Sequence, residues 1–105
     1  MTQALVVLCT SPNNGVATLL ASQIVEARLA ACVNLINPVL SIYSWQGKIE
    51  KANEVQLIIK THSELFEPLR SFIRAHHPYE VPEIMGLPVL LADEDYLNWL
   101  NDVTL

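Results

Sequence analysis

Residues 39–61, VLSIYSWQGKIEKANEVQLIIKT, have the pattern of one long antiparallel hairpin. Val39–Trp45 predicts one strand, Gln46–Gly47 the turn, and Asn53–Thr61 the returning strand. Because side chains alternate along a strand, the two faces of this hairpin differ. One face comprises Leu40, Ile42, Val55, Leu57 and Ile59, and the other comprises Ser41, Tyr43, Trp45, Glu54, Gln56, Ile58 and Lys60. A helical layer suits the first face, and contact with another subunit suits the second.

Two strands and a helix precede this hairpin or lead into it. A continuous apolar run, Ala4–Cys9, predicts a strand that is buried on both faces. Apolar residues then recur at three-and-four spacing from about residue 14 to about residue 30, which predicts the first helix. Cys32–Ile36 resumes strand character, and Asn37–Pro38 predicts a bulge or kink before the hairpin continues.

A second helix is predicted after the hairpin. Ser63 can cap it, and its regular turns begin near Phe66, because Pro68 is tolerated only in a first turn. The helix must end by His77, because Pro78 disfavours helical backbone in the residue before it. Its buried stripe is predicted to comprise Leu65, Leu69, Phe72, Ile73 and His76.

A further strand and a short helix complete the chain. Ile84–Leu91 predicts the strand, in which Pro88 suits an edge or a bulge, and Asp93 caps the final helix. The element order is therefore β-α-β-β-α-β with an added C-terminal helix. This is an α+β fold of the ferredoxin-like plan, in which two helices cover one sheet face and leave the other open. We interpret residues 1–105 as a single domain.

The composition indicates self-association. Of the 105 residues, 51% are hydrophobic and only 16% are charged, whereas an ordinary soluble domain has about 25% charged residues. So few charges cannot cover a monomer of this size, and we expect the open sheet face to be buried against other copies. The 11 acidic and 6 basic residues give a net charge of −5, which argues against a nucleic-acid partner.

The sequence predicts neither a membrane span nor an export signal. Apolar runs such as Ala4–Cys9 fall far short of the roughly 18 residues that a span needs. Met1–Gln3 lacks the positive charge of a signal peptide. Cys9 and Cys32 imply no disulfide framework, so we expect a reduced, cytoplasmic protein. We interpret Cys32, which follows two alanines into a strand, as a core residue.

Six short motifs occur in order over nearly the whole chain. They are LCT (8–10), LAACVN (29–34), YSWQGKIE (43–50), EVQLIIKT (54–61), HPYEVPEI (77–84) and YLNW (96–99). In combination they resemble the CutA family of divalent-cation tolerance proteins. The resemblance implies a ferredoxin-like protomer, a tight homotrimer in which the hairpins pair between subunits, and a role in tolerance to copper and other divalent metals. It also implies structural kinship to the trimeric PII signalling proteins, and it implies no catalytic reaction.

The resemblance also implies metal ligands. Copper-binding members of the family use a cysteine at the end of the first strand and paired histidines before Pro-Tyr, which correspond here to Cys9, His76 and His77. The predicted topology agrees, because the end of the first strand lies beside the start of the last strand and the end of the second helix. A thiolate with imidazoles suits copper or zinc. Alternatively, the histidines stabilise the helix C-terminus and Cys9 is an inert core residue. We do not expect the metal to be required for folding.

A second group of candidate residues combines aromatic rings with charges. One interpretation is a pocket at a subunit boundary that holds a small ligand or ion. The other is an interface, in which Lys60 pairs with a carboxylate of its own or a neighbouring chain, and the enrichment of aromatics at interfaces favours it. The group comprises Tyr43, Trp45, Glu54, Lys60, Tyr79, Glu80 and Trp99.

Three function classes follow from these observations. The leading hypothesis is a non-catalytic homotrimer that binds copper or other divalent metal ions and takes part in the response to them. The alternative is a PII-like signalling or scaffold module that binds a small ligand or a partner protein in clefts between subunits, although no Gly-rich phosphate loop is present. An enzyme is disfavoured, because no nucleophile, base and orienting group occur at a recognised spacing.

Overall fold

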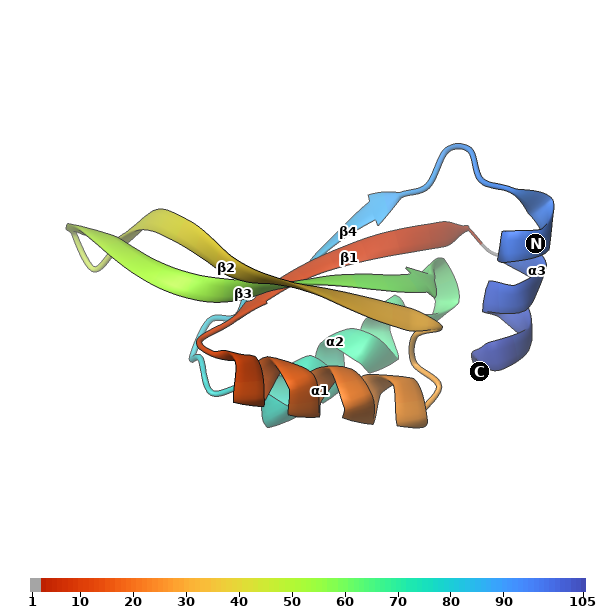
Figure 1. Ribbon diagram of the computed structural model, residues 1–105, viewed down its shortest axis with the longest axis horizontal. Coiled ribbons are helices and arrows are strands. Elements are labelled where there is room, and N and C mark those ends of the chain that lie inside the picture. The colour runs from red at the N-terminus through yellow and green to blue at the C-terminus, as the bar shows by residue number, and fades with distance from the viewer. Residues whose placement is uncertain (1–2) are drawn as a thin grey trace.

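The computed structural model describes residues 3–105 and has the predicted order of elements (Figure 1). These are β1 (Ala4–Ser11), α1 (Asn14–Glu26), β2 (Cys32–Trp45), β3 (Lys48–His62), a 3-10 turn η1 (Ser63–Leu65), α2 (Phe66–His76), β4 (Met85–Pro88) and α3 (Glu94–Val103). The first two residues of the predicted domain, Met1 and Thr2, lie outside the described residues. None of the helices within residues 3–105 is long and apolar enough to cross a membrane.

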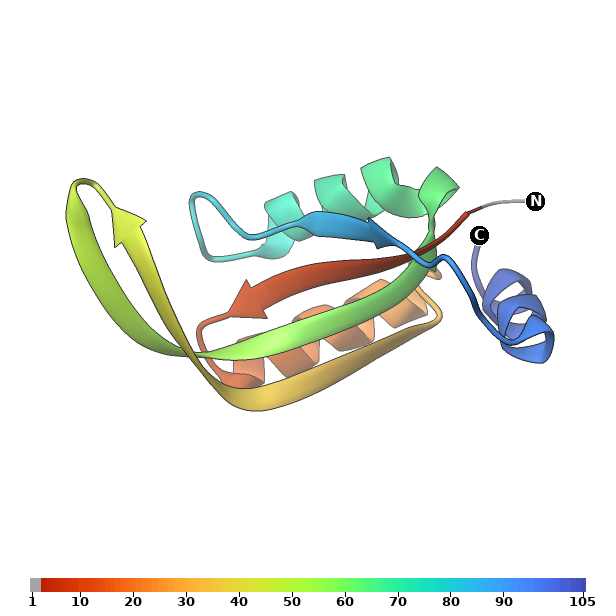
Figure 2. The same ribbon diagram turned by 90° about the horizontal axis from the view of Figure 1, so that it is seen from above.

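The strands form one antiparallel sheet in the order β2-β3-β1-β4. The apolar strand β1 lies centrally, between β3 and β4. The predicted burial on both faces holds only for the helix side, because Val7 and Cys9 are buried whereas Val6 and Leu8 on the open face are half-buried. Both α1 and α2 lie on one face of the sheet, and the opposite face carries no helix over these strands (Figures 1 and 2). The α+β plan with an open sheet face is therefore confirmed.

The core lies between the sheet and the two helices. Val7 and Cys9 of β1 face this core. Val7 pairs with Ile59 of β3, and Cys9 pairs with Leu57. The helices contribute apolar side chains at the predicted spacing, and all of these are buried: Leu20 and Ile24 from α1, and Leu69 and Ile73 from α2. This layer fixes β1, and thereby the position of its last residues at one end of the molecule.

The hairpin of β2 and β3 is much longer than the helical layer (Figure 2). Its proximal half, residues 32–36 with 55–62, belongs to the core sheet. The register shifts between Ile36 and Val39, at the predicted Asn37–Pro38 bulge, and the distal half, residues 39–54, continues beyond it. Gln46 and Gly47 make the turn with positive φ angles of 50° and 79°, as in a type I′ turn.

Helices cover less of the apolar hairpin face than predicted. The register places Leu40 and Ile42 on the same face as Leu57, as expected. Leu57 is fully buried, but Leu40 and Ile42 are 64% and 60% exposed because the helices end before the distal half begins. The expectation of a helical cover is therefore correct for the proximal half and wrong for the distal half.

Several local predictions differ from the structure. His76, predicted on the buried stripe of the second helix, is exposed. The first helix ends at Glu26 and not near residue 30, because Arg28 takes a left-handed conformation with φ of 61°. Ser63 makes no side-chain cap; it begins η1, although α2 does begin at Phe66 as expected. The last strand spans only Met85–Pro88 of the predicted 84–91. Cys32 is half-buried and pairs with Lys60 on the open face, so its assignment to the core is wrong.

The final helix α3 lies at the end of the molecule opposite the hairpin tip (Figure 1). Asp93 caps it as predicted, since its carboxylate accepts a hydrogen bond of 3.2 Å from the N–H of Tyr96. The guanidinium of Arg28 donates to the carbonyls of Val103 and Thr104 and ties the end of this helix to the end of α1.

Candidate functional site

The ends of β1 and α2 meet at one backbone carbonyl, that of Thr10. The buried imidazole of His77 donates from Nε2 to this carbonyl at 2.7 Å, and its Nδ1 accepts the N–H of Tyr79 at 3.0 Å. Cys9 directly precedes Thr10, and its Sγ lies 3.7 Å from the same carbonyl oxygen. The structure thus brings two of the three predicted metal ligands, Cys9 and His77, to one place.

The thiol of Cys9 is held in its protonated form. Burial, and then the negative charges of Glu83 and Glu54, raise its pKa from 9.0 to about 12. A metal binds the thiolate and not the thiol, so an ion would have to displace this proton. Any affinity of this thiol for a metal is therefore strongly dependent on pH.

His76 points away from this pair. It is the last residue of α2, its Nδ1 lies 2.8 Å from the carbonyl of Phe72, and its ring stacks on that of Phe72 at 4.1 Å. His77 has already left the helix, with ψ of 138°. Within residues 3–105, no three side chains of Cys, His, Asp or Glu are grouped so that they could hold a metal ion. The predicted donors are thus neighbours but do not form a ready-made metal site.

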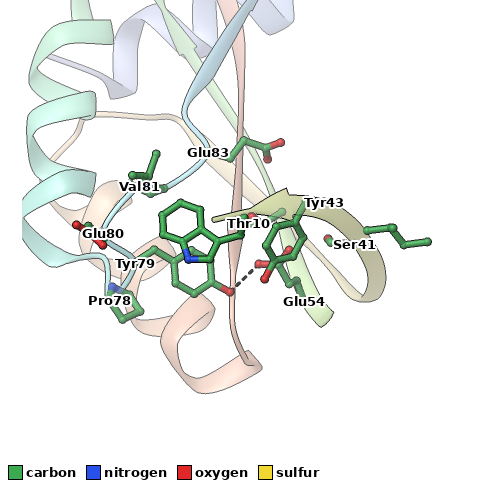
Figure 3. Close-up of a pocket in the computed structure, with 12 residues that line it drawn as sticks. Thr10, Ser41, Tyr43, Glu54, Pro78, Tyr79, Glu80, Val81 and Glu83 are labelled. Atoms are coloured by element: carbon green, nitrogen blue, oxygen red, sulfur yellow. Dashed lines mark hydrogen bonds between the residues drawn. The ribbon is translucent and has the colours of Figure 1, made fainter. Parts of the chain in front are cut away.

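A cavity of about 760 Å³ opens beside the same end of β1 (Figure 3). The distal half of the hairpin forms one wall, and the connector after α2, residues 78–83, forms the other. Five of the seven residues predicted for a pocket line this cavity: Tyr43, Trp45, Glu54, Tyr79 and Glu80. The remaining lining residues are Thr10, Ser41, Ile42, Pro78, Val81, Pro82 and Glu83.

A short hydrogen bond joins the two walls of this cavity. The hydroxyl of Tyr79 donates to Oε2 of Glu54 at 2.6 Å, as Figure 3 shows. Glu54 is only 7% exposed. Burial and the hydrogen bond to the Glu54 carboxylate raise the pKa of Tyr79, so that the phenol remains a neutral donor. The connector is thereby fastened to the hairpin just past its bulge.

Sequence reasoning missed Gln56 and Glu83 as parts of this region. The amide of Gln56 donates to the carbonyls of Cys9 and Leu57 at 3.0 and 3.1 Å, and it lies 3.4 Å from Oε2 of Glu83. The sequence pattern could have placed both residues in this region. Gln56 shares a strand face with Glu54, and Glu83 lies two residues before β4, the strand that pairs with β1.

The other two residues of the predicted group lie outside the cavity within one chain. Nζ of Lys60 lies 4.0 Å from Sγ of Cys32, and the ion pair found among residues 3–105, Arg70 with Glu67 on α2, does not involve Lys60. Trp99 packs against Tyr96 on α3, with ring centroids 5.5 Å apart. The expected pairing of Lys60 with a carboxylate is therefore not present within the described part of this chain.

Comparison with known proteins agrees with this topology. The sequence model of the CutA1 divalent ion tolerance protein family matches residues 5–103. This chain belongs to that family. The divalent-cation tolerance protein CutA of Yersinia pestis is 47% identical over 98 residues, which are 93% of this chain and 82% of that protein. The family is defined by tolerance to divalent cations and not by a reaction, in agreement with the expectation of a non-catalytic protein.

Solved structures of family members have the same fold. CutA1 from Oryza sativa superposes with a TM-score of 0.95 at 39% identity, and the match covers 98% of this chain and 94% of that one. A CutA from Archaeoglobus fulgidus, described as a periplasmic divalent cation tolerance protein, gives 0.93 at 35% identity over 95% of this chain and 97% of that one. These matches confirm the ferredoxin-like fold with its long hairpin and added C-terminal helix.

Proposed function

We propose that this CutA1 family member acts in divalent-cation tolerance as a homotrimer that binds a copper-class ion weakly through Cys9, His77 and His76. The meeting of Cys9 and His77 at the carbonyl of Thr10 carries this proposal. A soft sulfur donor beside imidazole nitrogen favours copper or zinc over magnesium or calcium. His76, the next residue along the chain, would have to turn away from the carbonyl of Phe72 to become the third donor.

Several features make the proposed binding weak and reversible. The Cys9 thiol must lose a proton whose pKa is raised to about 12. The imidazole of His77 already uses both nitrogens in hydrogen bonds, and one of these bonds must break before a metal is bound. The core is fully packed around Cys9, which supports a metal that is not required for folding. Such a protein responds to an excess of ions and does not hold one permanently.

The trimeric part of the proposal is supported by the exposed apolar surface. The distal half of the hairpin exposes Leu40, Ile42 and Ile49, and the open sheet face exposes Ile36 and Leu87. A water-soluble protein rarely leaves so many large apolar side chains uncovered. Further copies of the chain would bury it.

The thiols support a reducing location. Cys9 and Cys32 are both free, and unpaired cysteines are typical of the cytoplasm. We therefore propose a cytoplasmic protein, although the related archaeal protein is described as periplasmic.

A titration with Cu(II) under anaerobic conditions tests the metal assignment. Cys9→Ser and His77→Ala should each weaken binding by about tenfold or more, because each removes one of few donors. Cys32→Ser is the matched control, since it removes the other thiol, and it should leave the isotherm unchanged. Light scattering should show that all variants keep the mass of the wild-type assembly. Unchanged isotherms for both Cys9→Ser and His77→Ala would remove the metal assignment.

The cavity favours a second candidate function, the binding of a small ligand or a partner protein, as in a PII-like signalling module. Its support is that Tyr43, Trp45, Glu54, Tyr79 and Glu80 all line one cavity. The volume of about 760 Å³ lies within the range of small-molecule sites, about 300–1,000 Å³. A thermal-shift screen of metals against small metabolites separates the two candidates. A metal shift that depends on Cys9 supports the first, and a metabolite shift that depends on Glu54 supports the second.

A further inference from the structure

The cavity beside Tyr79 has a negative lining with no positive charge to balance it. Glu54, Glu80 and Glu83 contribute three carboxylates to it (Figure 3). None of its lining residues in the described part of the chain is a lysine, an arginine or a histidine. The excess of negative over positive side chains is therefore greater in this cavity than in the whole chain, whose 105 residues have a net charge of −5.

Glu54 is the carboxylate in this cavity that most needs a partner. A buried carboxylate is costly unless its oxygens are hydrogen-bonded or paired with a cation, and it has about four acceptor sites. Glu54 is 93% buried, and among residues 3–105 its side chain accepts one hydrogen bond, from Tyr79. The described residues supply it with no cation. A positively charged group in the cavity would compensate this charge.

The aromatic side chains of the cavity are arranged for the same kind of group. Tyr43 and Trp45 of the hairpin are 44% and 40% exposed, and Tyr79 of the connector is half-buried. An aromatic face attracts a cation through its quadrupole and covers an apolar chain by direct contact. Val81 adds further exposed apolar surface to the connector wall.

A bare metal ion does not fit these walls as well as an organic cation does. Metal ions need a tight shell of several donors, and the described residues contain no group of three such side chains. The apolar walls would contribute nothing to a hydrated ion. The volume of about 760 Å³ is also far larger than one ion requires.

We propose that this cavity binds a small alkylammonium cation, with its charged group against Glu54 and its carbon atoms against Tyr43, Trp45 and Tyr79. The inference rests on the second candidate function, that the cavity holds a small ligand, and it names the chemical class of that ligand. It uses neither the Cys9 thiol nor the His77 imidazole as a ligand.

Choline and its uncharged isostere 3,3-dimethyl-1-butanol are the probes for the test. The protein is the full chain with Trp99→Phe, so that Trp45 in the cavity is the one remaining indole. Choline should change the fluorescence of Trp45 in a saturable manner, and the isostere should bind about tenfold or more weakly because it lacks the charge. This comparison needs no variant of the cavity itself.

Substitutions then locate the charge that is recognised. Glu54→Gln should weaken choline binding by about tenfold or more, because it removes the buried charge at nearly constant shape. Glu80→Gln, which changes an exposed carboxylate, should weaken it by roughly twofold to fivefold. Glu64→Gln is the matched control, since Glu64 is exposed on η1 away from the cavity, and it should have no effect.

The possible failures are distinguishable. Equal affinity for choline and its isostere would overturn the cation inference but leave the cavity as a ligand site. Tighter binding of the dianion glutarate than of choline would have the same two consequences. The absence of saturation by all three probes below about 10 mM would overturn both the inference and the second candidate function. Neither result bears on the copper titration, which depends on Cys9.

Discussion

The two halves of the hairpin are built from the same two strands but differ in what covers them. In the proximal half, Leu57 and Ile59 are fully buried against the helices. In the distal half, Leu40, Ile42 and Ile49 are 64%, 60% and 74% exposed. The physical reason is length, because the 13 residues of α1 span about 20 Å, whereas the 15 residues of β3 follow a curved path of about 50 Å.

The distal half is therefore the surface through which we propose that copies of the chain associate. Its side chains are as apolar as those of the proximal half, but no element of the same chain reaches them (Figure 2). The cavity lies where the two halves meet, since Glu54 is the first residue of β3 beyond the bulge. Substitutions in each half, and at their junction, should therefore have different effects.

The largest expected effect is on assembly. Ile42→Glu places a charge on the distal apolar surface and should convert the proposed trimer to monomers at about 10 µM, with unchanged far-UV circular dichroism. Leu19→Glu is the matched control, since Leu19 is 61% exposed but lies on α1. Light scattering measures both masses. A trimer that tolerates Ile42→Glu as well as Leu19→Glu would remove the distinction between the two halves.

The next effect is on the stability of the proximal half. Ile59→Ala leaves a cavity under the helices and should lower the free energy of unfolding by about 2–5 kcal/mol. Urea denaturation of the variant and the wild type measures the loss. A loss below about 1 kcal/mol would contradict the close packing inferred for this half.

A smaller effect depends on pH and on Cys9, which faces the same core. The pKa of its thiol is about 12 in the folded chain, above the ordinary 9.0, so the unfolded chain loses the proton first as pH rises. The contribution of Cys9 to stability is therefore complete below pH 9 and declines between pH 9 and about pH 12, by about 1.4 kcal/mol per pH unit.

Urea denaturation at several pH values from 7.5 upward measures this decline. Cys9→Ala should decline less steeply than the wild type, and Cys32→Ala, the matched control, should decline as the wild type does. Equal slopes for wild type and Cys9→Ala would show that the thiol is not buried as described.

The smallest effect is expected at the junction of the two halves. Tyr79→Phe removes the hydrogen bond to Glu54 and should cost about 1–2 kcal/mol of folding stability, because the acceptor is charged and buried. Tyr96→Phe serves as the control, since its hydroxyl makes no hydrogen bond among the described residues. Thermal unfolding of both variants gives the comparison, and equal midpoints would contradict the bracing role of Tyr79.

Local signals predicted much of the fold. The apolar run of β1, the bulge at Asn37–Pro38 and the cap at Asp93 are each set by a few adjacent residues, and all three are present. Features that depend on distant residues were predicted less well. The left-handed turn at Arg28 that ends α1, and the half-buried position of Cys32 opposite Lys60, follow from how whole elements pack.

The candidate site shows the same division. Topology alone was sufficient to predict that the end of β1 lies beside the end of α2, where His77 now contacts the carbonyl of Thr10. Residue types alone grouped Trp99 and Lys60 with Tyr79, but in one chain they lie on other surfaces. The hydrogen bonds that occupy both ring nitrogens of His77 could not be predicted, because they depend on the exact path of the connector.

Sedimentation equilibrium of the wild-type chain at about 10 µM tests most directly whether the distal hairpin and the open sheet face are covered by other copies. We expect a single species with three times the 11.7 kDa mass of one chain. A folded, stable species with the mass of one chain would contradict this expectation.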